Sequence, residues 1–230
     1  MTNSENYNEL KNLALGEGMA LFGVADISSA RGGFLIPVAI RNQFACAISL
    51  GFGLSRPIVE TVEGMPNLHY YFHYQRANIL LDQTALKVAS LIQKKGYNAF
   101  PIPASQIVDW KLQLGSVSHR EIARLAGHGW YGKNNLLVNG TYGSGVRYVT
   151  ALTDMPLDTD KPLEGSCGAC ALCIDACPAK AIREDGFDRD ACHAKLKEFS
   201  KIQGIGQMIC GVCIKACPSK GNFESQKNRQ

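Results

Sequence analysis

The stretch that decides the fold is Cys167–Pro178, CGACALCIDACP, in which four cysteines stand at the spacing C-x2-C-x2-C-x3-C before a proline. This run holds 4Fe-4S clusters in bacterial electron carriers, where its fourth cysteine ligates a second cluster. A second stretch, Ile209–Pro218, reads ICGVCIKACP and repeats the last steps as C-x2-C-x3-C-P. Cys192 lies between the two runs and supplies an eighth thiol. Eight thiolates predict two cubane clusters.

The usual interleaving of such runs divides these thiolates into two ligand sets. Structural zinc is the alternative, because C-x2-C pairs also build tetrahedral zinc sites. The doubled C-x2-C spacing and the two C-x3-C-P steps favour iron-sulfur clusters, which carry one electron at a time. The first set is Cys167, Cys170, Cys173 and Cys217, and the second, which rests partly on elimination, is Cys177, Cys192, Cys210 and Cys213.

The composition indicates a globular protein without a membrane partner. Of 230 residues, 46% are hydrophobic and 19% are charged. The longest apolar stretches are far shorter than the roughly 20 residues of a membrane helix. The polar N-terminus lacks a targeting pattern, so a cytoplasmic protein with reduced cysteines is expected. The net charge of +4 is spread along the chain and is weak evidence for nucleic acid.

Hydrophobic periodicity ahead of the cysteines alternates between helical and strand patterns, which predicts an α+β fold of layered α/β character. The expected domains are residues 1–160 and a small bacterial-ferredoxin-like double-cluster domain, residues 161–230, joined by a polar linker at 157–164. An aromatic run at 69–74 precedes the longest helix and either lines a flat cofactor or, as we expect, packs in the core. Helices are predicted at 4–15, 77–95 and 121–126, and strands at 21–25, 44–50, 98–102, 135–138 and 146–153.

A glycine-rich loop, GHGWYGK at residues 127–133, matches the residue spacing of nucleotide-binding motifs but not their structural context. Such patterns need a strand before the glycines and a helix after them, whereas here a helix leads in and a strand leads out. We therefore reject a nucleotide site. The glycines still indicate close approach of the backbone, either to a neighbouring strand or to a ligand. The isolated Cys46 is interpreted as a buried thiol rather than a catalytic one.

Four stretches together resemble the epoxyqueuosine reductase family. They are SHREIARLAGHGWYGKNNLLVN from Ser118, YGSGVRYVTALTDMPL from Tyr142, and the two cysteine runs, so the resemblance extends from about Ser118 to Pro218. It implies a nitroreductase-like domain that binds cobalamin beside two 4Fe-4S clusters, as in the similar reductive dehalogenases. The family's C-terminal repeat extension is not matched, which suggests a short form and makes transfer RNA the less expected partner.

The same resemblance implies the residues that contact the corrinoid. The sequence has no D-x-H-x-x-G, so a histidine lower ligand to cobalt is not indicated. The implied contacts are Gly127, Gly129, Trp130, Gly132, Lys133 and Asn134, followed by Tyr142, Gly143 and Ser144.

The proton donor is less clearly marked. The family carries a V-D-S-A-P-like element whose aspartate has this role, and Gln113 stands at that position here. Asp109 serves only if the loop is shifted by four residues. His119 and Tyr131 are the other candidates, and each is equally well explained as an ordinary polar group.

Three functions follow from these observations. The first is an iron-sulfur oxidoreductase that passes electrons from a low-potential donor, such as ferredoxin or flavodoxin, through two clusters to a corrinoid that reduces an unidentified substrate. The second is epoxyqueuosine reduction in transfer RNA. The third is a non-enzymatic electron carrier or corrinoid-protein activator whose first domain docks a partner.

Overall fold

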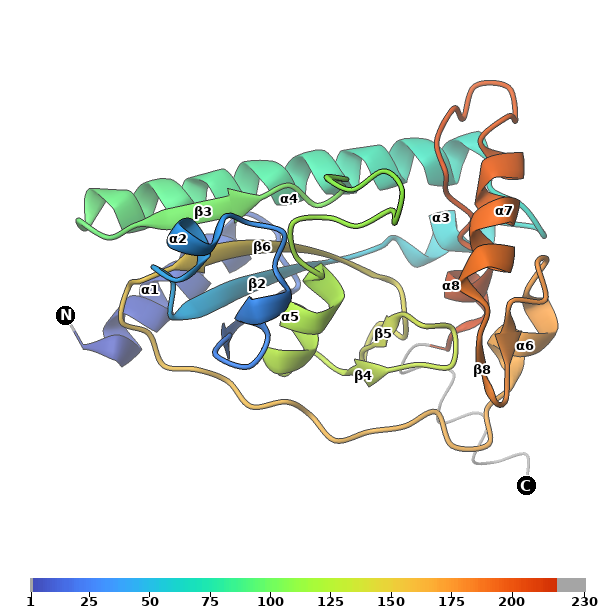
Figure 1. Ribbon diagram of the computed structural model, residues 1–230. Coiled ribbons are helices and arrows are strands. Elements are labelled where there is room, and N and C mark those ends of the chain that lie inside the picture. The colour runs from blue at the N-terminus through green and yellow to red at the C-terminus, as the bar shows by residue number, and fades with distance from the viewer. Residues whose placement is uncertain (1, 219–230) are drawn as a thin grey trace. The chain divides into compact units, whose positions relative to one another are not determined.

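The computed structural model describes residues 2–218, which form two compact units (Figure 1). Unit 1 combines the chain up to Gly53 with Ala77–His128 and Arg147–Leu163, and unit 2 combines Leu54–Arg76, Gly129–Val146 and the described residues from Glu164 onward. The units therefore do not follow chain order. The assignment of function to domains at residues 1–160 and 161–230 stays a prediction.

Unit 1 is built on a four-stranded sheet in the order β1-β2-β6-β3. Its strands are β1 (Leu21–Asp26), β2 (Cys46–Gly53), β3 (Ala99–Ile102) and β6 (Val146–Thr153). Its helices are α1 (Asn3–Gly16), η1 (Arg31–Gly33), α2 (Val38–Arg41), most of α4 (Leu68–Lys94) and α5 (His119–Leu125). Mixed α/β structure is thus confirmed, and Figure 1 shows α4 running along the sheet.

Two apolar clusters cover the two faces of this sheet. Ile48 and Leu81 belong to the cluster that α1 and α4 build with the strands. Leu152 and Ile122 belong to the cluster that includes α5. All four side chains are fully buried. The alternation of faces along β2 and β6 follows from the period of two in a strand, and it produces the layered arrangement that the sequence predicts.

Helix α4 begins earlier than its apolar periodicity predicts. The aromatic run at residues 69–74 forms its first turns instead of preceding it. Asn67 starts the helix, because its side-chain oxygen accepts the backbone N–H of Tyr70 at 2.9 Å. Tyr70 is buried, and its ring lies so close to Gly211 that a Cβ there would be 2.8 Å from the ring. Packing in the core, as expected for this aromatic run, therefore explains the buried position of Tyr70, and no cofactor is needed to account for it.

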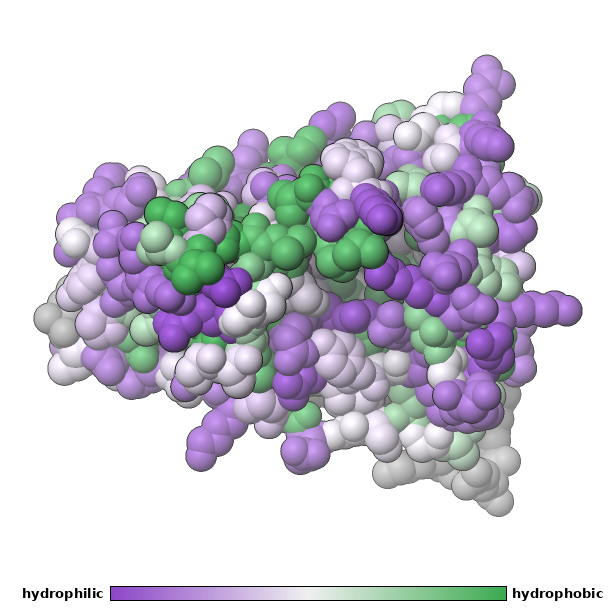
Figure 2. Space-filling model, viewed as in Figure 1, coloured by the Kyte–Doolittle hydropathy of each residue, from purple (hydrophilic) through white to green (hydrophobic). Residues whose placement is uncertain are grey.

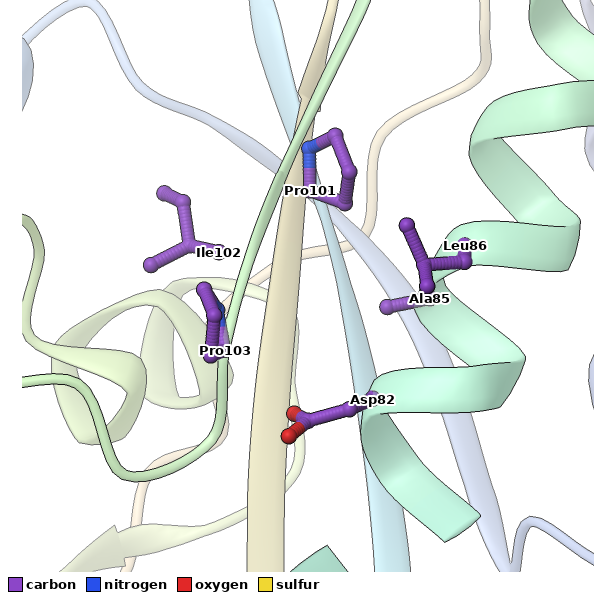
Figure 3. Close-up of a pocket in the computed structure, with 6 residues that line it drawn as sticks. All are labelled: Asp82, Ala85, Leu86, Pro101, Ile102 and Pro103. Atoms are coloured by element: carbon purple, nitrogen blue, oxygen red, sulfur yellow. The ribbon is translucent and has the colours of Figure 1, made fainter. Parts of the chain in front are cut away.

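Strand β3 is an edge strand, which is why it accommodates prolines. It pairs only with β6 among the described strands, and Pro101 lies within it. The chain after β3 is held by α4, because the Asp82 carboxylate accepts the backbone N–H of Ala104 at 2.8 Å. Figure 3 shows Asp82 pointing from α4 toward β3, beside a hollow of about 80 Å³ that Pro103 also lines.

The polar segment expected to be a linker is fixed to unit 1, so that expectation is wrong. The Asp160 carboxylate accepts the Val24 N–H at 2.8 Å and the Tyr7 hydroxyl at 3.0 Å, and the Asp160 N–H donates to the Val24 carbonyl. Leu157 is buried in the core. Because the charged Asp160 carboxylate accepts two hydrogen bonds from unit 1, the segment at 157–163 packs as part of that unit; we call this segment the strap.

Unit 2 consists of short elements. The predicted strand at 135–138 shortens to β5 (Leu137–Val138), which pairs with β4 (Trp130–Tyr131). A second pair, β7 (Ile182–Arg183) and β8 (Gly186–Phe187), lies between the cysteine runs. The helices are α3 (Arg56–Glu60), the start of α4, α6 (Leu172–Ala176), α7 (Arg189–Phe199) and α8 (Val212–Ala216).

One face of unit 1 exposes apolar side chains. Figure 2 shows them over α2 and over the loop between β3 and α5. Val38 is 58% exposed and Trp110 is 69% exposed. The same surface includes Leu35, Ile40, Val108, Leu112 and Leu114. Between residues 2 and 218, no helix is long and apolar enough to cross a membrane.

Candidate functional site

The first thiol group, Cys167, Cys170, Cys173 and Cys217, brings together ends of two short helices. Cys173 lies in α6 and Cys217 caps α8. Burial raises the pKa of the Cys173 thiol to about 11, and the charges of Cys217, Cys167 and Cys170 raise it further. These three thiols are therefore within electrostatic reach of Cys173, although Cys217 is far away in the sequence.

The second thiol group, Cys177, Cys192, Cys210 and Cys213, shows the same mutual influence. Burial raises the pKa of Cys210 to about 11, with further contributions from Cys192 and Cys177. Burial also raises the pKa of Cys213, followed by the charges of Cys210 and Cys192. Cys213 is also influenced by Cys173 of the first group, so these charges do not separate the two predicted ligand sets. Their binding of iron stays a prediction.

Backbone donors point at thiols in both groups. The Ser144 N–H donates to the Cys217 sulfur at 3.2 Å, and the Ala181 N–H donates to the Cys177 sulfur at 3.4 Å. Such donors stabilise thiolates and tune iron-sulfur clusters. The nine cysteines are all free thiols. The residues therefore fit thiolate ligation.

The spacing of the side chains is not that of a site for one metal ion. Among the described residues, no three His, Cys, Asp or Glu side chains are grouped closely enough to hold such an ion. A mononuclear zinc site draws four ligands to about 2.0–2.3 Å from one atom. A cubane distributes its cysteines over four iron corners, so its thiolates lie farther apart.

Close contacts within the protein explain three of the loop glycines in unit 2. A Cβ on Gly129 would lie 2.0 Å from the Val138 carbonyl oxygen. One on Gly132 would lie 2.6 Å from the Val138 side chain, and one on Gly143 would lie 2.5 Å from the Pro218 carbonyl oxygen. Of the two explanations left open by the sequence, approach to neighbouring protein groups accounts for these glycines.

In unit 1, close approach of a neighbouring protein group also explains Gly127. It has a φ of +74°, and a Cβ there would lie 2.7 Å from the Lys161 carbonyl oxygen. The chain order around the loop is helix α5 before the glycines and strand β5 after them, with the two-residue β4 between Gly129 and Gly132. This order is confirmed and is opposite to that of a nucleotide-binding loop.

Asn134 and Ser144 connect the loop to the first thiol group. The Asn134 side-chain amide donates to the Ser144 hydroxyl at 3.0 Å, and both residues are buried. Because the Ser144 N–H contacts the Cys217 sulfur, the pair positions a thiol ligand. These contacts make both residues positioning residues whether or not they also touch a corrinoid.

Two predicted contact residues offer groups to a ligand. The Trp130 indole nitrogen is buried and has no hydrogen-bond partner among residues 2–218. Tyr142 lines a hollow of about 230 Å³ with Arg56, Thr141 and Ile214. This volume is below the roughly 300 Å³ at which small-molecule pockets begin.

Lys133 approaches the first thiol group and also makes an ion pair. Its ammonium lies 2.7 Å from the Glu184 carboxylate. Glu184 raises the pKa of Lys133, and the charges of Cys167 and Cys170 raise it further. Sequence patterns gave no sign of Glu184, which lies 51 residues away in the chain.

The three proton-donor candidates differ in their surroundings. In unit 1, the His119 ring nitrogens bind the Thr150 hydroxyl at 2.8 Å and the Pro103 carbonyl at 3.0 Å. Burial lowers the pKa of His119 to about 4, which keeps the ring neutral. Both nitrogens are engaged, which favours a structural role.

Asp109 and Tyr131 lie in different units. In unit 1, Asp109 closes a hairpin turn with Leu114, and its carboxylate accepts the Leu112 N–H at 2.8 Å. In unit 2, Tyr131 is 42% exposed in β4. Of the three candidates, Tyr131 alone lies in the unit that contains the eight clustered cysteines.

Curated relatives match part of the chain. No protein-family model matches it. An epoxyqueuosine reductase from Bacillus cereus is 38% identical over 88 residues, which are 38% of this chain and 23% of that protein. One from Aliivibrio fischeri is 33% identical over 106 residues, 46% of this chain and 26% of that protein. The matches thus span about a quarter of the length of these relatives.

Solved structures match nearly all of the described fold. The catabolic reductive dehalogenase NpRdhA has a TM-score of 0.78 at 19% identity, covering 95% of this chain and 32% of its own. Epoxyqueuosine reductase from Streptococcus thermophilus has a TM-score of 0.63 at 18% identity, covering 93% and 66%. Another epoxyqueuosine reductase, solved with a modified transfer RNA stem loop, has a TM-score of 0.65 at 18% identity, covering 93% and 65%.

The fold is that of reductive dehalogenases and epoxyqueuosine reductases. The predicted resemblance is confirmed: epoxyqueuosine reductases are homologous to the matched part of this chain.

Proposed function

We propose that this chain is an iron-sulfur oxidoreductase that passes electrons through two 4Fe-4S clusters to a corrinoid, which reduces an organic substrate. The observation that carries the proposal is the gathering in unit 2 of eight free thiols that influence one another's charges. In this proposal residues 161–230 hold the clusters, and residues 1–160 form a nitroreductase-like domain in the cytoplasm that binds the corrinoid.

The clusters when bound supply one-electron carriers, and the corrinoid supplies a cobalt centre that accepts electrons at low potential. A related solved structure is described as suggesting a mechanism for B12-dependent dehalogenation. In this chain the buried Trp130 indole N–H is available to bind a polar corrinoid side chain. Tyr142 borders a hollow that another such side chain would enter. The implied glycine contacts would act by allowing close approach of the backbone.

Proton delivery is assigned to Tyr131 in this proposal. Tyr131 is 42% exposed and lies in unit 2 with the eight clustered cysteines, whereas His119 and Asp109 lie in unit 1. A tyrosine hydroxyl can act as a general acid when it is within hydrogen-bond reach of the reacting group.

The substrate class follows from the relatives. Epoxyqueuosine reduction in transfer RNA is the first substrate to test, because the curated relatives bear that activity in their names and one related structure holds a transfer RNA stem loop. A small organic substrate is the alternative, since the fold is shared with reductive dehalogenases. Ferredoxin or flavodoxin is the proposed class of electron donor.

The test begins with anaerobic reconstitution of the full chain, followed by iron analysis and addition of cob(II)alamin under electron paramagnetic resonance. About eight irons per chain and a changed cobalt spectrum are expected. Trp130→Phe keeps an aromatic ring without the N–H, so weaker corrinoid binding with unchanged iron is expected. An unchanged cobalt spectrum with both clusters intact would contradict the corrinoid proposal.

An electron carrier is the second candidate function. The exposed apolar surface of unit 1, which includes Val38 and Trp110, is typical of a protein-docking face (Figure 2). A carrier would show fast cluster reduction, electron transfer that depends on a partner protein, and no turnover of epoxyqueuosine or small substrates. Substrate turnover by the isolated chain would exclude it.

A further inference from the structure

A hollow of about 550 Å³ lies in unit 1, where three strand ends meet at one end of the sheet. Asp26 ends β1 and lies opposite Cys46, the first residue of β2. The Ala45 N–H donates at 3.2 Å to the carbonyl of Thr153, the last residue of β6. The strap closes one side of the hollow through Leu157. Small-molecule sites occupy roughly 300–1,000 Å³, so the hollow is large enough to bind a small molecule.

The proposed function leaves this hollow unused. The residues implied to contact a corrinoid at 142–144 precede β6, whereas the hollow lies where β6 ends. At about 3.3 Å per residue, the eight residues of β6 extend over roughly 23 Å. The implied contacts between Gly127 and Asn134 do not line the hollow either. Its side chains therefore need an explanation of their own.

The hollow holds opposite charges that do not pair with each other. The Asp26 carboxylate and the Arg31 guanidinium both line it. The hydrogen bond from the Ser28 N–H lowers the pKa of Asp26, and the charge of Arg31 lowers it further, so the two charges are near each other. Within the described chain, however, they form no ion pair and each is held by a different group. A ligand that carries both charges can bridge them.

The backbone fixes both charged groups in place. The Arg31 guanidinium donates to the Phe44 carbonyl at 3.1 Å, and the Asp26 carboxylate accepts the Ser28 N–H at 2.8 Å. A guanidinium has five N–H donors and a carboxylate about four acceptor positions, so both groups keep capacity for a ligand. Groups that are already oriented lose less conformational entropy when they bind.

Asp154 adds a second negative charge to the hollow. Its carboxylate accepts the backbone N–H of Asn98 at 2.8 Å and the side-chain amide of Asn98 at 2.6 Å. Burial raises the pKa of the Cys46 thiol, and Asp26 and Asp154 raise it further, so both carboxylates approach the same thiol. Two carboxylates and one guanidinium give the lining a net charge of −1. Among the described residues, no three His, Cys, Asp or Glu side chains are grouped to hold a metal ion, so a metal does not explain the carboxylates.

We infer that this hollow binds a free α-amino acid with a basic side chain. Arg31 binds the α-carboxylate and Asp26 binds the α-ammonium, because charge-assisted hydrogen bonds of this kind are the strong ones. The remaining negative charge of the lining favours a second cation on the ligand. The buried Met155 and Leu157 offer apolar contacts to the methylene groups of the ligand. The inference depends on unit 1 alone and not on the proposed clusters or corrinoid.

The test is isothermal titration calorimetry of the anaerobically reconstituted full chain with four probes. L-lysine carries all three charges, lysinamide lacks the carboxylate, Nα-acetyl-lysine lacks the α-ammonium, and L-glutamate carries an acidic side chain. The variants are Asp26→Asn and Arg31→Gln, with Arg31→Lys as the change that keeps the charge and a donor. Asp185→Asn is the matched control, because it removes the same charge as Asp26→Asn from a side chain of unit 2 that is 87% exposed. Circular dichroism checks that each variant is folded.

The unaltered chain and Asp185→Asn should bind L-lysine, and the other three probes should bind about tenfold more weakly, as expected for loss of one charge-assisted hydrogen bond. Arg31→Gln should weaken the binding of L-lysine about tenfold and leave that of lysinamide unchanged, because lysinamide has no group for Arg31. Asp26→Asn should do the same for L-lysine and Nα-acetyl-lysine. Arg31→Lys should lie between Arg31→Gln and the unaltered chain.

Three results would overturn the inference. They are no heat of binding with L-lysine at millimolar concentration, tighter binding of L-glutamate than of L-lysine, and equal weakening of L-lysine and lysinamide by Arg31→Gln. None of them affects the iron-sulfur proposal, because the iron content of the same samples tests that proposal separately.

Discussion

Unit 1 and unit 2 differ in what stabilises the interior of each. Unit 1 has an eight-residue β2 paired with neighbours on both sides and a buried core on each face of its sheet. Unit 2 contains two five-residue helices that carry cysteines, and its strand pairs are two residues long. Isolated helices shorter than about 12 residues are marginal in water.

The difference teaches that apolar burial suffices for unit 1, whereas unit 2 would be completed by the cluster ligation proposed above. Burial of apolar surface stabilises unit 1 directly. In unit 2 the thiols that would repel one another as anions lie at the ends of short helices, so binding of the proposed clusters, whose iron-sulfide cores are cationic, would add to the free energy of folding. Four predictions test this contrast, starting with the largest effect.

Loss of one cluster ligand should unfold part of unit 2 and leave unit 1 intact. In Cys213→Ser we expect iron to fall from about eight to about four per chain, because one cubane loses a corner ligand. Amide hydrogen exchange should accelerate in α7 and α8 and stay slow in β2 and β6. Cys46→Ala is the control, since that thiol is buried in unit 1 and its pKa is raised to about 12. Full iron content in Cys213→Ser would contradict the ligand assignment.

Gly129→Ala should destabilise unit 2 through a steric clash. The added Cβ would lie 2.0 Å from the Val138 carbonyl oxygen, so β4 and β5 must separate, at a cost of about 3 kcal/mol. Urea denaturation with hydrogen exchange of residues 129–146 measures this. Gly140→Ala is the matched control, because a Cβ there meets nothing within 4 Å. Equal stability of the two variants would refute the close approach.

Unit 1 should lose stability in acid through His119. Its pKa is about 4 in the folded chain against an ordinary value of 6.5, so the unfolded chain binds more protons between these values. The stabilisation is complete above pH 6.5 and is lost as the pH falls toward 4. A loss of about 2 kcal/mol is expected at pH 5. Hydrogen exchange of α5 and β6, corrected for the intrinsic rate, should show it. His119→Gln should reduce the pH dependence, and buried His128, whose pKa is also lowered by burial, accounts for part of the remainder.

The strap at Asp160 should contribute the smallest of these effects. Its carboxylate accepts the Tyr7 hydroxyl, and burial together with Asp160 raises the pKa of Tyr7 to about 12. Tyr7→Phe should lower the free energy of unfolding of unit 1 by about 1 kcal/mol. A double-mutant cycle with Asp160→Asn isolates the pair. Additive effects would show that the hydrogen bond contributes nothing.

The sequence predicted what local patterns encode. The helix at 121–126 appears as α5 with Ser118 capping it through the Glu121 N–H, and the strand at 146–153 appears with those bounds. The beginning of α4 was missed because aromatic residues obscured its periodicity, and Asn67 was the available signal. Local rules work where the determining contacts are within a few residues.

The candidate site was only partly accessible from the sequence. The cysteine runs give the ligand types because their spacing is local, whereas Arg56 lies 161 residues from its carbonyl acceptor on Cys217. Glycine-loop residues looked like ligand contacts because close backbone approach has the same sequence signature whatever group is approached. Their protein neighbours, such as the Val138 carbonyl for Gly129, are visible only in three dimensions.

The interleaving of the two units along the chain also determines the order in which they can fold during synthesis. Unit 1 is complete once residue 163 has left the ribosome, whereas Leu54–Arg76 and Gly129–Val146 must wait for the cysteine-rich segment that follows. Contacts between such distant segments form slowly, because the long intervening loop costs entropy before the contacts stabilise it. A nascent chain therefore presents a folded scaffold with two unsatisfied loops. If the proposed clusters bind, their insertion would be the last step of folding, and an interrupted supply of iron would leave unit 2 unfolded and open to proteolysis.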